Sequence, residues 1–258
     1  MSRYERWNGL LSLLASRGRL NVEEAAAELS VSAATIRRDF DQLAQQQMLI
    51  RTRGGAVAHT VTYDLPLRYK SARHASDKQR IAAVAAELVQ PGSVIGINGG
   101  TTTTEVARAL ATRADLHGES GPPSITIVTN ALNIANELVV RPHVKIVLTG
   151  GVALPQSYEL VGPLANGVFD QVTLDVAFLG VSGLDVARGA TCPNEDEASI
   201  NRQMAVRAEQ VVVVADGSKL GERAFAKICE IREVDVLVTD ANADARPFEE
   251  AGLKVVRA

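Results

Sequence analysis

The chain has 258 residues, a formal net charge of −3, and 46% hydrophobic but only 4% aromatic residues. This composition excludes a disordered chain and suits one large domain or two modest ones. No apolar run reaches the ~18–20 residues of a membrane span, the N-terminus does not resemble a signal peptide, and two cysteines make no disulfide framework, so we expect a cytoplasmic protein that does not bind a membrane.

The first 58 residues are mildly basic and predict three helices. They carry eight Arg and no Lys against six acidic residues, whereas the remainder carries 19 basic and 24 acidic residues. Apolar residues at i, i+3, i+4 and i+7 from Trp7 predict a first helix, which Gly18 ends. Asn21 with Glu24 is close to a capping box for a second helix. Ser32 can cap a third helix through its hydroxyl.

Two adjacent arginines lie near the start of the third predicted helix. Ile36 and Phe40 face the core by their spacing, so Arg37 and Arg38 must project largely outward. Two short helices with a tight turn match a helix-turn-helix, in which the start of the second helix enters the major groove. There an arginine can bond phosphate or the edge of guanine, and which arginine does which stays open. In the alternative, both arginines pair with Asp41 on a solvated helix face.

Residues 48–57 predict a short β-ribbon. Gly54 and Gly55 supply the turn, and Arg51 and Arg53 alternate to one face, which is typical of a wing against the DNA backbone. Together with the capped helices, this ribbon favours DNA binding over the solvated face. The residues expected to contact DNA are Ser32, Ala34, Thr35, Arg37, Arg38, Arg51 and Arg53.

Beyond a predicted linker at residues 59–76, β-branched runs alternate with helical patterns to the end of the chain. Strands are expected at 93–97, 125–129, 144–148, 175–179, 210–215, 234–238 and 253–256. Such continuous runs between helices indicate an open parallel sheet that is covered on both faces. We therefore expect an N-terminal domain at residues 1–58 and an α/β domain at 77–258, with a surface loop at 117–123.

Small, hydroxylated and charged residues follow the predicted strands of the α/β domain. Ligands bind at the carboxyl ends of the strands in such a sheet. The segment Asn98-Gly-Gly-Thr-Thr-Thr-Thr104 opens a helix directly, so its hydroxyls and amides can donate to an oxyanion. Turn geometry and capping explain any single loop. Six such strand ends, one of which carries Lys219, favour a phosphate-bearing polar ligand, although no nucleotide fingerprint is present.

Other chemistry is not indicated. The four histidines show no metal spacing, and Cys192 and Cys229 lack a CxxC partner, so we expect no metal and no cofactor. The segment Asn194-Glu-Asp-Glu197 can be interpreted as an acid–base cluster facing the ligand side. Acidic residues are also expected at a helix N-terminus on dipole grounds, and we favour that capping role.

Several short motifs follow one another in a fixed order. In the N-terminal part they are Val31-Ser32, Thr35-Ile-Arg-Arg-Asp39 and residues 51–56. Further along they are residues 78–82, 100–102, 128–130, 150–151, 175–180 and 215–219. With these motifs the chain resembles the DeoR family of bacterial transcription regulators over nearly its whole length. Asn98 departs from the family pattern, where Asp is common, and so does Gly217, where His or Ser is common.

The resemblance implies a winged helix-turn-helix followed by a sensor domain. The sensor would have the open, mostly parallel sheet of ribose-5-phosphate isomerase, glucosamine-6-phosphate deaminase and CoA-transferase folds. The resemblance also implies a sugar-phosphate effector, a repressor, and a homo-oligomer that we expect to be a dimer or tetramer. The residues expected to contact the effector are Asn98, Gly100, Thr101, Thr102, Thr103, Thr129, Asn130, Gly151, Gly183, Asp216 and Lys219.

The predicted function is regulation of carbohydrate-metabolism genes through double-stranded DNA, not catalysis. The alternative is a sugar-phosphate isomerase or deaminase with an accessory DNA-binding head, for which Asp216 and Glu195 are the candidate bases. The sequence leaves open the effector, the operator, repression versus activation, the direction of the effector response and the oligomer size.

Overall fold

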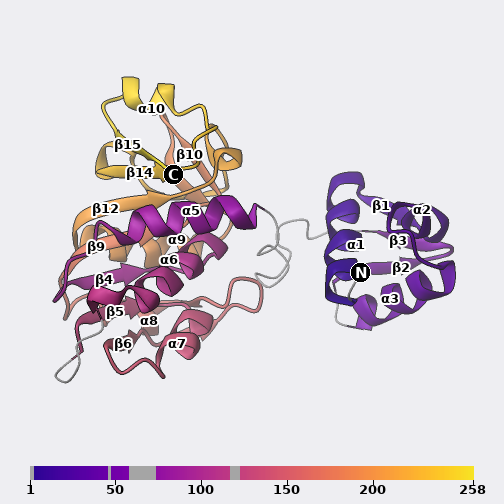
Figure 1. The fold of residues 1–258 in the computed structure, drawn as a ribbon, viewed down its shortest axis with the longest axis horizontal. Coiled ribbons are helices and arrows are strands. Elements are labelled where there is room, and N and C mark those ends of the chain that lie inside the picture. Colours follow the sequence, from indigo (N-terminus) through magenta and orange to yellow (C-terminus); the bar gives the residue numbers. More distant parts are fainter. Residues whose placement is uncertain (1–2, 46–47, 58–73, 117–122) are drawn as a thin grey trace. The chain divides into compact units, whose positions relative to one another are not determined.

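A computed structural model of the chain describes residues 3–45, 48–57, 74–116 and 123–258. The chain divides into two compact units, Met1–Ala72 and Arg73–Ala258, which we call the head and the body (Figure 1). Most of the predicted linker at 59–76 and of the predicted loop at 117–123 lies outside the described residues, and Ala75 and Ser76 already belong to a helix of the body. None of the described helices is long and apolar enough to cross a bilayer.

The head contains the three predicted helices and a small antiparallel sheet. The helices are α1 (Arg3–Arg17), α2 (Val22–Glu28) and α3 (Ala33–Gln45). The strands β1 (Arg19–Asn21), β2 (Ile50–Thr52) and β3 (Gly55–Val57) lie in the order β1-β3-β2. The ribbon of β2 and β3 was predicted, whereas β1 was not, because three residues after a helix carry no readable alternation.

The predicted caps and turn of the head are confirmed. The Asn21 side chain accepts from the Glu24 amide at 2.7 Å, and the Glu24 carboxylate accepts from the Asn21 amide at 3.5 Å. The Ser32 hydroxyl accepts from the Thr35 amide at 3.2 Å. Gly54, with φ +88°, turns the β2–β3 hairpin. A Cβ on Gly55 would lie 2.3 Å from the Leu20 carbonyl oxygen, so only glycine lets β3 pass this close to β1.

A buried carboxylate ties α1 to α3 within the core of the head. Asp39 is 2% exposed and accepts from the Trp7 indole nitrogen at 2.8 Å. The Arg6 guanidinium donates to both oxygens of the same carboxylate, with 3.1 Å from Nη2 to Oδ1. Asp39 therefore fixes the start of the first helix against the middle of the third.

The body is built on a seven-stranded parallel sheet in the order β15-β14-β12-β9-β4-β5-β6. The strands are β4 (Val94–Ile97), β5 (Ile125–Thr129), β6 (Val144–Leu148), β9 (Leu174–Leu179), β12 (Ala208–Val214), β14 (Val236–Thr239) and β15 (Lys254–Arg257). All seven were predicted, because they are short, largely apolar runs between helical segments, and most of them are rich in β-branched residues.

Six helices cover the two faces of this sheet (Figure 1). One apolar core receives α5 (Ala75–Ala86), α6 (Thr101–Thr112) and α7 (Leu132–Leu138). The other receives α8 (Pro163–Asn166), α9 (Glu195–Val206) and α10 (Arg246–Glu250). Successive strand residues alternate between the cores: Phe178 packs in the first, Ala177 and Leu179 in the second.

Two small antiparallel sheets complete the body. They are β10 (Gly183–Asp185), β11 (Gly189–Cys192) and β13 (Ala226–Cys229), and the hairpin of β7 (Val152–Ala153) and β8 (Leu160–Val161). In the large sheet, the chain moves from β4 outward to β5 and β6, then returns to the other side of β4 with β9. The carboxyl ends of β4 and β9 therefore form a topological switch point, where ligands bind in open α/β sheets.

Replacing Asp39 with Ala should destabilise the head by about 2–4 kcal/mol, because it leaves the Trp7 indole and the Arg6 guanidinium without their buried acceptor. Trp7 is the only tryptophan of the chain, so urea unfolding followed by its fluorescence reports on the head alone. The matched control is Asp41→Ala, which removes an exposed ion pair with Arg51 and should cost at most about 1 kcal/mol. Equal losses in the two variants would contradict this role of Asp39.

Candidate functional site

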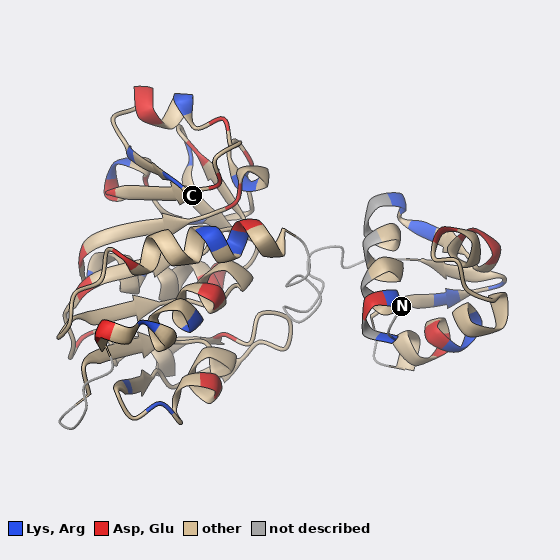
Figure 2. Cartoon of the chain, viewed as in Figure 1, with Lys and Arg blue, Asp and Glu red and all other residues tan. Residues whose placement is uncertain are grey.

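The start of α3 presents an exposed surface with two arginines. Ala34, Arg37 and Arg38 are exposed on α3, and Arg53 is exposed in the hairpin turn. Neither Arg38 nor Arg53 forms an ion pair with a residue that the structure describes. The Arg37 guanidinium lies 3.4 Å from the Glu23 carboxylate, between two exposed side chains. Figure 2 shows acidic residues on all three helices of the head, and Glu23, Glu24 and Glu28 of α2 are the largest group.

Arg51 differs from these arginines because its side chain is bonded to other residues of the head. Its Nε donates to Asp41 Oδ1 at 2.8 Å, its Nη1 donates to the Gly55 carbonyl at 2.7 Å, and its guanidinium lies 5.6 Å from the Phe40 ring centre. Asp41, the expected partner of Arg37 and Arg38 in the solvated-face alternative, is thus bonded to Arg51. Arg51 braces the ribbon against α3, and its predicted contact with DNA stays a prediction.

In the body, the Asn98 side chain closes the switch point between β4 and β9. Its Nδ2 donates to the Gly180 carbonyl at 3.0 Å, and its Oδ1 accepts from the Gly180 amide at 2.8 Å. An ionised aspartate has no hydrogen to donate, so this two-way bond uses the amide of asparagine. The side chain is 1% exposed. Asn98 therefore fixes the two strand ends relative to each other.

The N-terminus of α6 follows directly from this point. Gly100 is the N-cap residue, and no side chain caps the helix from that position. Thr101 is half-buried and Thr102 is 8% exposed, whereas Thr103 is fully buried. The Thr103 and Thr104 hydroxyls donate back to the Gly100 carbonyl at 3.2 and 2.6 Å. The first-turn amides are thus better placed than the Thr103 hydroxyl to meet an anion.

The end of β5 contributes Thr129, whose hydroxyl is hydrogen-bonded on both sides, and Asn130, whose side chain is not bonded to any described residue. The Thr129 hydroxyl donates to the Ile97 carbonyl at 2.6 Å and accepts from the Ala131 amide at 3.0 Å. Asn130 is fully buried, yet neither its Nδ2 nor its Oδ1 has a partner of hydrogen-bond geometry among the described residues. An unpaired buried polar atom costs about 1–3 kcal/mol.

Two of the predicted effector contacts are glycines in close packing. A Cβ at Gly151 would lie 2.6 Å from the Val161 carbonyl oxygen, and one at Gly183 would lie 2.4 Å from the Glu222 carbonyl oxygen. Gly151 also has φ +126°. The close approach of the backbone explains both glycines, and their contact with an effector stays a prediction.

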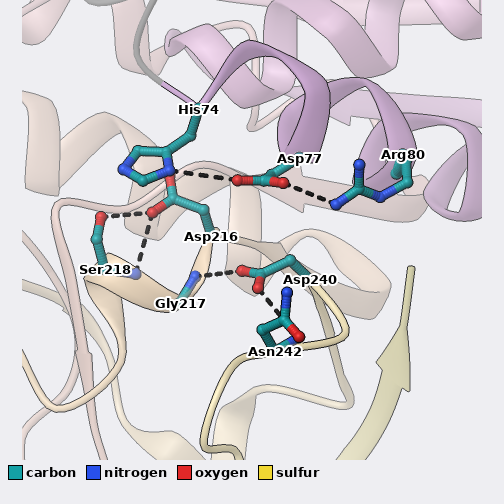
Figure 3. Close-up of polar contacts among 8 residues, drawn as sticks. All are labelled: His74, Asp77, Arg80, Asp216, Gly217, Ser218, Asp240 and Asn242. Atoms are coloured by element: carbon teal, nitrogen blue, oxygen red, sulfur yellow. Dashed lines mark hydrogen bonds and ion pairs between the residues drawn. The ribbon is translucent and has the colours of Figure 1, made fainter.

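A second polar group follows β12, which lies two strands and roughly 10 Å from β4. Asp216 accepts from the Ser218 amide at 3.1 Å and from its hydroxyl, and Asp240 accepts from the Gly217 amide at 2.6 Å (Figure 3). Burial tends to raise the pKa of Asp216, but the Ser218 hydrogen bonds and the charges of Lys219 and His74 lower it below its ordinary value. This carboxylate therefore stays ionised beside Lys219.

Figure 3 also shows the start of α5, which lies beside Asp216. His74 has φ +54°, and its Nδ1 lies 3.2 Å from Asp77 Oδ2; Arg80 donates to the other Asp77 oxygen at 2.7 Å (Figure 3). The first described residue of the body thus lies next to a predicted effector residue. The described residues contain no group of three His, Cys, Asp or Glu that could hold a metal ion.

The residue that sequence reasoning missed is Glu159, in the loop between β7 and β8. Its Oε1 accepts from the Gly99 amide at 2.6 Å, and the side chain is 2% exposed. The loop is held by bonds from Leu160 to the Asn130 carbonyl and from Leu132 to the Tyr158 carbonyl, at 2.7 and 2.9 Å. A lone glutamate in an irregular loop offers no periodic signal, so only the fold reveals this contact.

Glu159 lies near a second buried carboxylate, Glu197 on α9, which is 7% exposed. Burial and then the charge of Glu197 raise the pKa of Glu159 to about 8, against the hydrogen bond from Gly99 and the neighbouring Asn201 and Asn130 side chains, which lower it. Asn194 caps α9 by accepting from the Asp196 and Glu197 amides at 2.9 and 3.0 Å. The predicted capping role of this segment is confirmed, and the buried Glu197 in addition acts on the pKa of Glu159.

Comparison with known proteins gives matches over both units. Residues 6–62 match the family described as the DeoR-like helix-turn-helix domain, and residues 73–241 match the DeoR C terminal sensor domain. The HTH-type transcriptional regulator GlpR of Haloferax volcanii is 36% identical over 98% of this chain and 96% of its own length. The glycerol-3-phosphate regulon repressor of Escherichia coli strain K12 is 33% identical over 93% and 92%.

Among solved structures, ribose 5-phosphate isomerase A of Methanocaldococcus jannaschii aligns with a TM-score of 0.40 and 19% identity. The alignment covers 57% of this chain and 55% of that one.

Glu159→Gln should flatten the pH dependence of the stability of the body. The unfolded group ionises near 4.5 and the folded group near 8, so the folded state holds one extra proton between these values. Stability from this group is therefore full below about pH 4.5 and falls as the pH rises to 8, by up to ~1.4 kcal/mol per pH unit. Calorimetric unfolding of the full chain from pH 5 to 8, with Trp7 fluorescence marking the head, measures the slope.

The control for this experiment is Glu209→Gln, which changes an exposed glutamate of β12. It should keep the slope of the unchanged protein. Parallel slopes in the Glu159 variant and the unchanged protein would contradict a protonated Glu159 at neutral pH.

Proposed function

The chain belongs to the DeoR family of DNA-binding transcriptional regulators, and from this premise we propose that it represses carbohydrate-metabolism genes and responds to a phosphorylated sugar or polyol. The relative from Escherichia coli is named as a repressor of a glycerol-3-phosphate regulon, which supports a small phosphorylated effector. The enzyme alternative is not carried forward: the matched families and relatives are regulators, and Glu195 is exposed on the first turn of α9.

The observation that carries the proposal is the exposed arginine surface of α3 and the hairpin. Arg37, Arg38 and Arg53 have no buried carboxylate to neutralise them, and they extend from a rigid helix and a tight turn. In a helix-turn-helix, residues at this place reach base edges and phosphates. The Ser32 hydroxyl caps α3 and lies 2.9 Å from the Thr35 hydroxyl, so both hydroxyls would meet phosphate at the helix start.

The effector would bind at the carboxyl ends of the strands of the body. The α6 amides after Gly100 and the Lys219 ammonium group would hold its phosphate, because both donate to anions. Asn98 and Asp216 would shape the walls between these two donors. Thr101 and Thr102 are the two threonines of the α6 turn that retain some exposure, so they would line the entrance.

A homo-oligomer, either a dimer or a tetramer, would place two heads on one operator. Symmetric assemblies read repeated half-sites. The body offers apolar surface near the edge of the sheet: Val140 is 75% exposed, Val152 63% and Leu164 78%. DNA sites selected from a random library by the full-length protein should therefore contain two related half-sites, and a single unpaired half-site would overturn this assembly.

Changing Arg37 and Arg38 together to Ala should weaken binding to the selected site by about tenfold or more, at roughly 1–3 kcal/mol for a base-reading arginine. Each lost phosphate contact should also lower the salt slope by about one. Fluorescence anisotropy over a range of salt concentrations measures both quantities. The control is Arg232→Ala, an exposed arginine of the body; unchanged affinity in the double variant would refute the proposed DNA surface.

Replacing Lys219 with Ala should weaken binding of the phosphorylated effector by about tenfold to a hundredfold, since a charge-assisted bond contributes roughly 1.5–3 kcal/mol. DNA binding in the absence of effector should persist. Calorimetric titration after a screen of phosphorylated sugars and polyols gives the affinity. Lys254→Ala is the control, because Lys254 is exposed at the start of β15, at the opposite end of the sheet. An unchanged affinity would remove Lys219 from the site.

A further inference from the structure

A group of buried polar side chains surrounds Glu159. It joins four segments that are distant in the sequence: Gly99 after β4, Asn130 after β5, Glu159 between β7 and β8, and Glu197 on α9. Asn201, one turn further along α9, adds an amide that is 2% exposed. The group thus contains two carboxyl groups and two amides, and the Gly99 bond ties it to the start of α6.

The asparagines show that this group is not complete in the described structure. Both amide atoms of the fully buried Asn130 lack a partner, and so does Oδ1 of Asn201. Both side chains belong to the surroundings of Glu159, and each acts to lower the pKa of its carboxyl group. Buried polar atoms are normally bonded, and unpaired ones call for a partner from outside. The partner must be able both to donate and to accept.

The group lies next to the start of α6, where the phosphate of the effector is proposed to bind, and this position limits which part of a ligand could reach it. Gly99 donates to Glu159, and the next residue, Gly100, is the N-cap of α6. A Cβ at Gly99 would lie 2.3 Å from Cγ of Glu159, so the carboxylate packs directly onto the turn. Atoms attached to a phosphate bound at this helix start would therefore lie against Glu159.

We propose that Glu159, Glu197 and Asn130 form a hydroxyl-recognition subsite that takes the polyol part of a phosphorylated effector. The inference rests on the proposed function and deepens it. A hydroxyl group donates to a carboxylate and accepts from an amide, so a pair of neighbouring hydroxyls matches one carboxyl group and both atoms of Asn130. On binding, the Glu159 carboxyl exchanges its bond with the Gly99 amide for a bond with the ligand, and that amide becomes free for the phosphate.

The pKa of Glu159, raised to about 8 by burial and by Glu197, suits this role. A protonated Glu159 carboxyl group carries no charge against Glu197, and it can donate a hydrogen bond as well as accept one. The other groups that bear on Glu159, the Gly99 amide and the Asn201 and Asn130 side chains, are neutral. A hydroxyl-bearing ligand is thus favoured over a second anion at this point.

The test compares ligands with and without hydroxyl groups on the full-length protein. The probes are inorganic phosphate, glycerol 3-phosphate, ribose 5-phosphate and fructose 6-phosphate, titrated calorimetrically into the unchanged protein, Glu159→Gln and Glu197→Gln. The tightest hydroxyl-bearing probe should bind the unchanged protein at least about tenfold more tightly than phosphate. Each variant should lose about tenfold for that probe, the equivalent of one buried hydrogen bond. Its affinity for inorganic phosphate should stay within about twofold, because the donors at the helix start remain.

Glu209→Gln is the matched control and should leave every affinity unchanged. Calorimetric unfolding of each variant shows whether its body is folded. If one of the two variants does not fold, the other one carries the test. If the variants bind all probes as the unchanged protein does, or lose phosphate and polyol affinity equally, the hydroxyl subsite is overturned while the proposed function stands. If the unchanged protein binds none of the phosphorylated sugars or polyols, the effector part of the proposed function fails, and the subsite fails with it.

Discussion

A parallel sheet brings the carboxyl ends of its strands to one edge, and at this edge the body must satisfy polar groups that water does not reach. Asn98 does so by bonding both the amide and the carbonyl of Gly180, and Thr129 by bridging Ile97 to Ala131. These bonds hold β4, β5 and β9 in one arrangement. Because the strand ends are fixed in this way, the residues that remain unsatisfied do not reflect a loose loop. They lie on a rigid frame, which is what a recognition site requires.

The sequence predicted those parts of the fold that local patterns encode. Six of the seven strands of the large sheet are rich in β-branched residues, the seventh, β9, is a mostly apolar run, and the caps at Asn21 and Ser32 follow from residues three apart. The strands of the small sheets of the body are two to four residues long and contain at most one β-branched residue each, so no apolar run separates them from loops. The Glu159–Gly99 bond joins residues 60 positions apart. No local pattern carries such a contact, because it exists only after the sheet has formed.

The arginines of the head also show that local patterns do not predict contacts between elements. Alternation along the ribbon placed Arg51 and Arg53 together, yet Arg51 is bonded to Asp41 and Gly55 while Arg53 is exposed in the turn. The deciding factor is the position of Asp41, ten residues away on α3, which occupies Arg51 and leaves Arg38 with no carboxylate among the described residues. A carboxylate that neutralises one arginine thereby defines which of the others stay available for DNA.

The two proposed halves of the effector site would perform different tasks. Backbone amides at a helix start and a lysine attract any phosphate, so they supply affinity with little discrimination. Carboxyl and amide groups in a buried position discriminate strongly, since a ligand without the matching hydroxyl leaves them unpaired. Effectors act by binding one arrangement of a protein better than another. The proposed subsite would supply such a difference, because a bound hydroxyl would complete the hydrogen bonds of the buried Asn130 side chain.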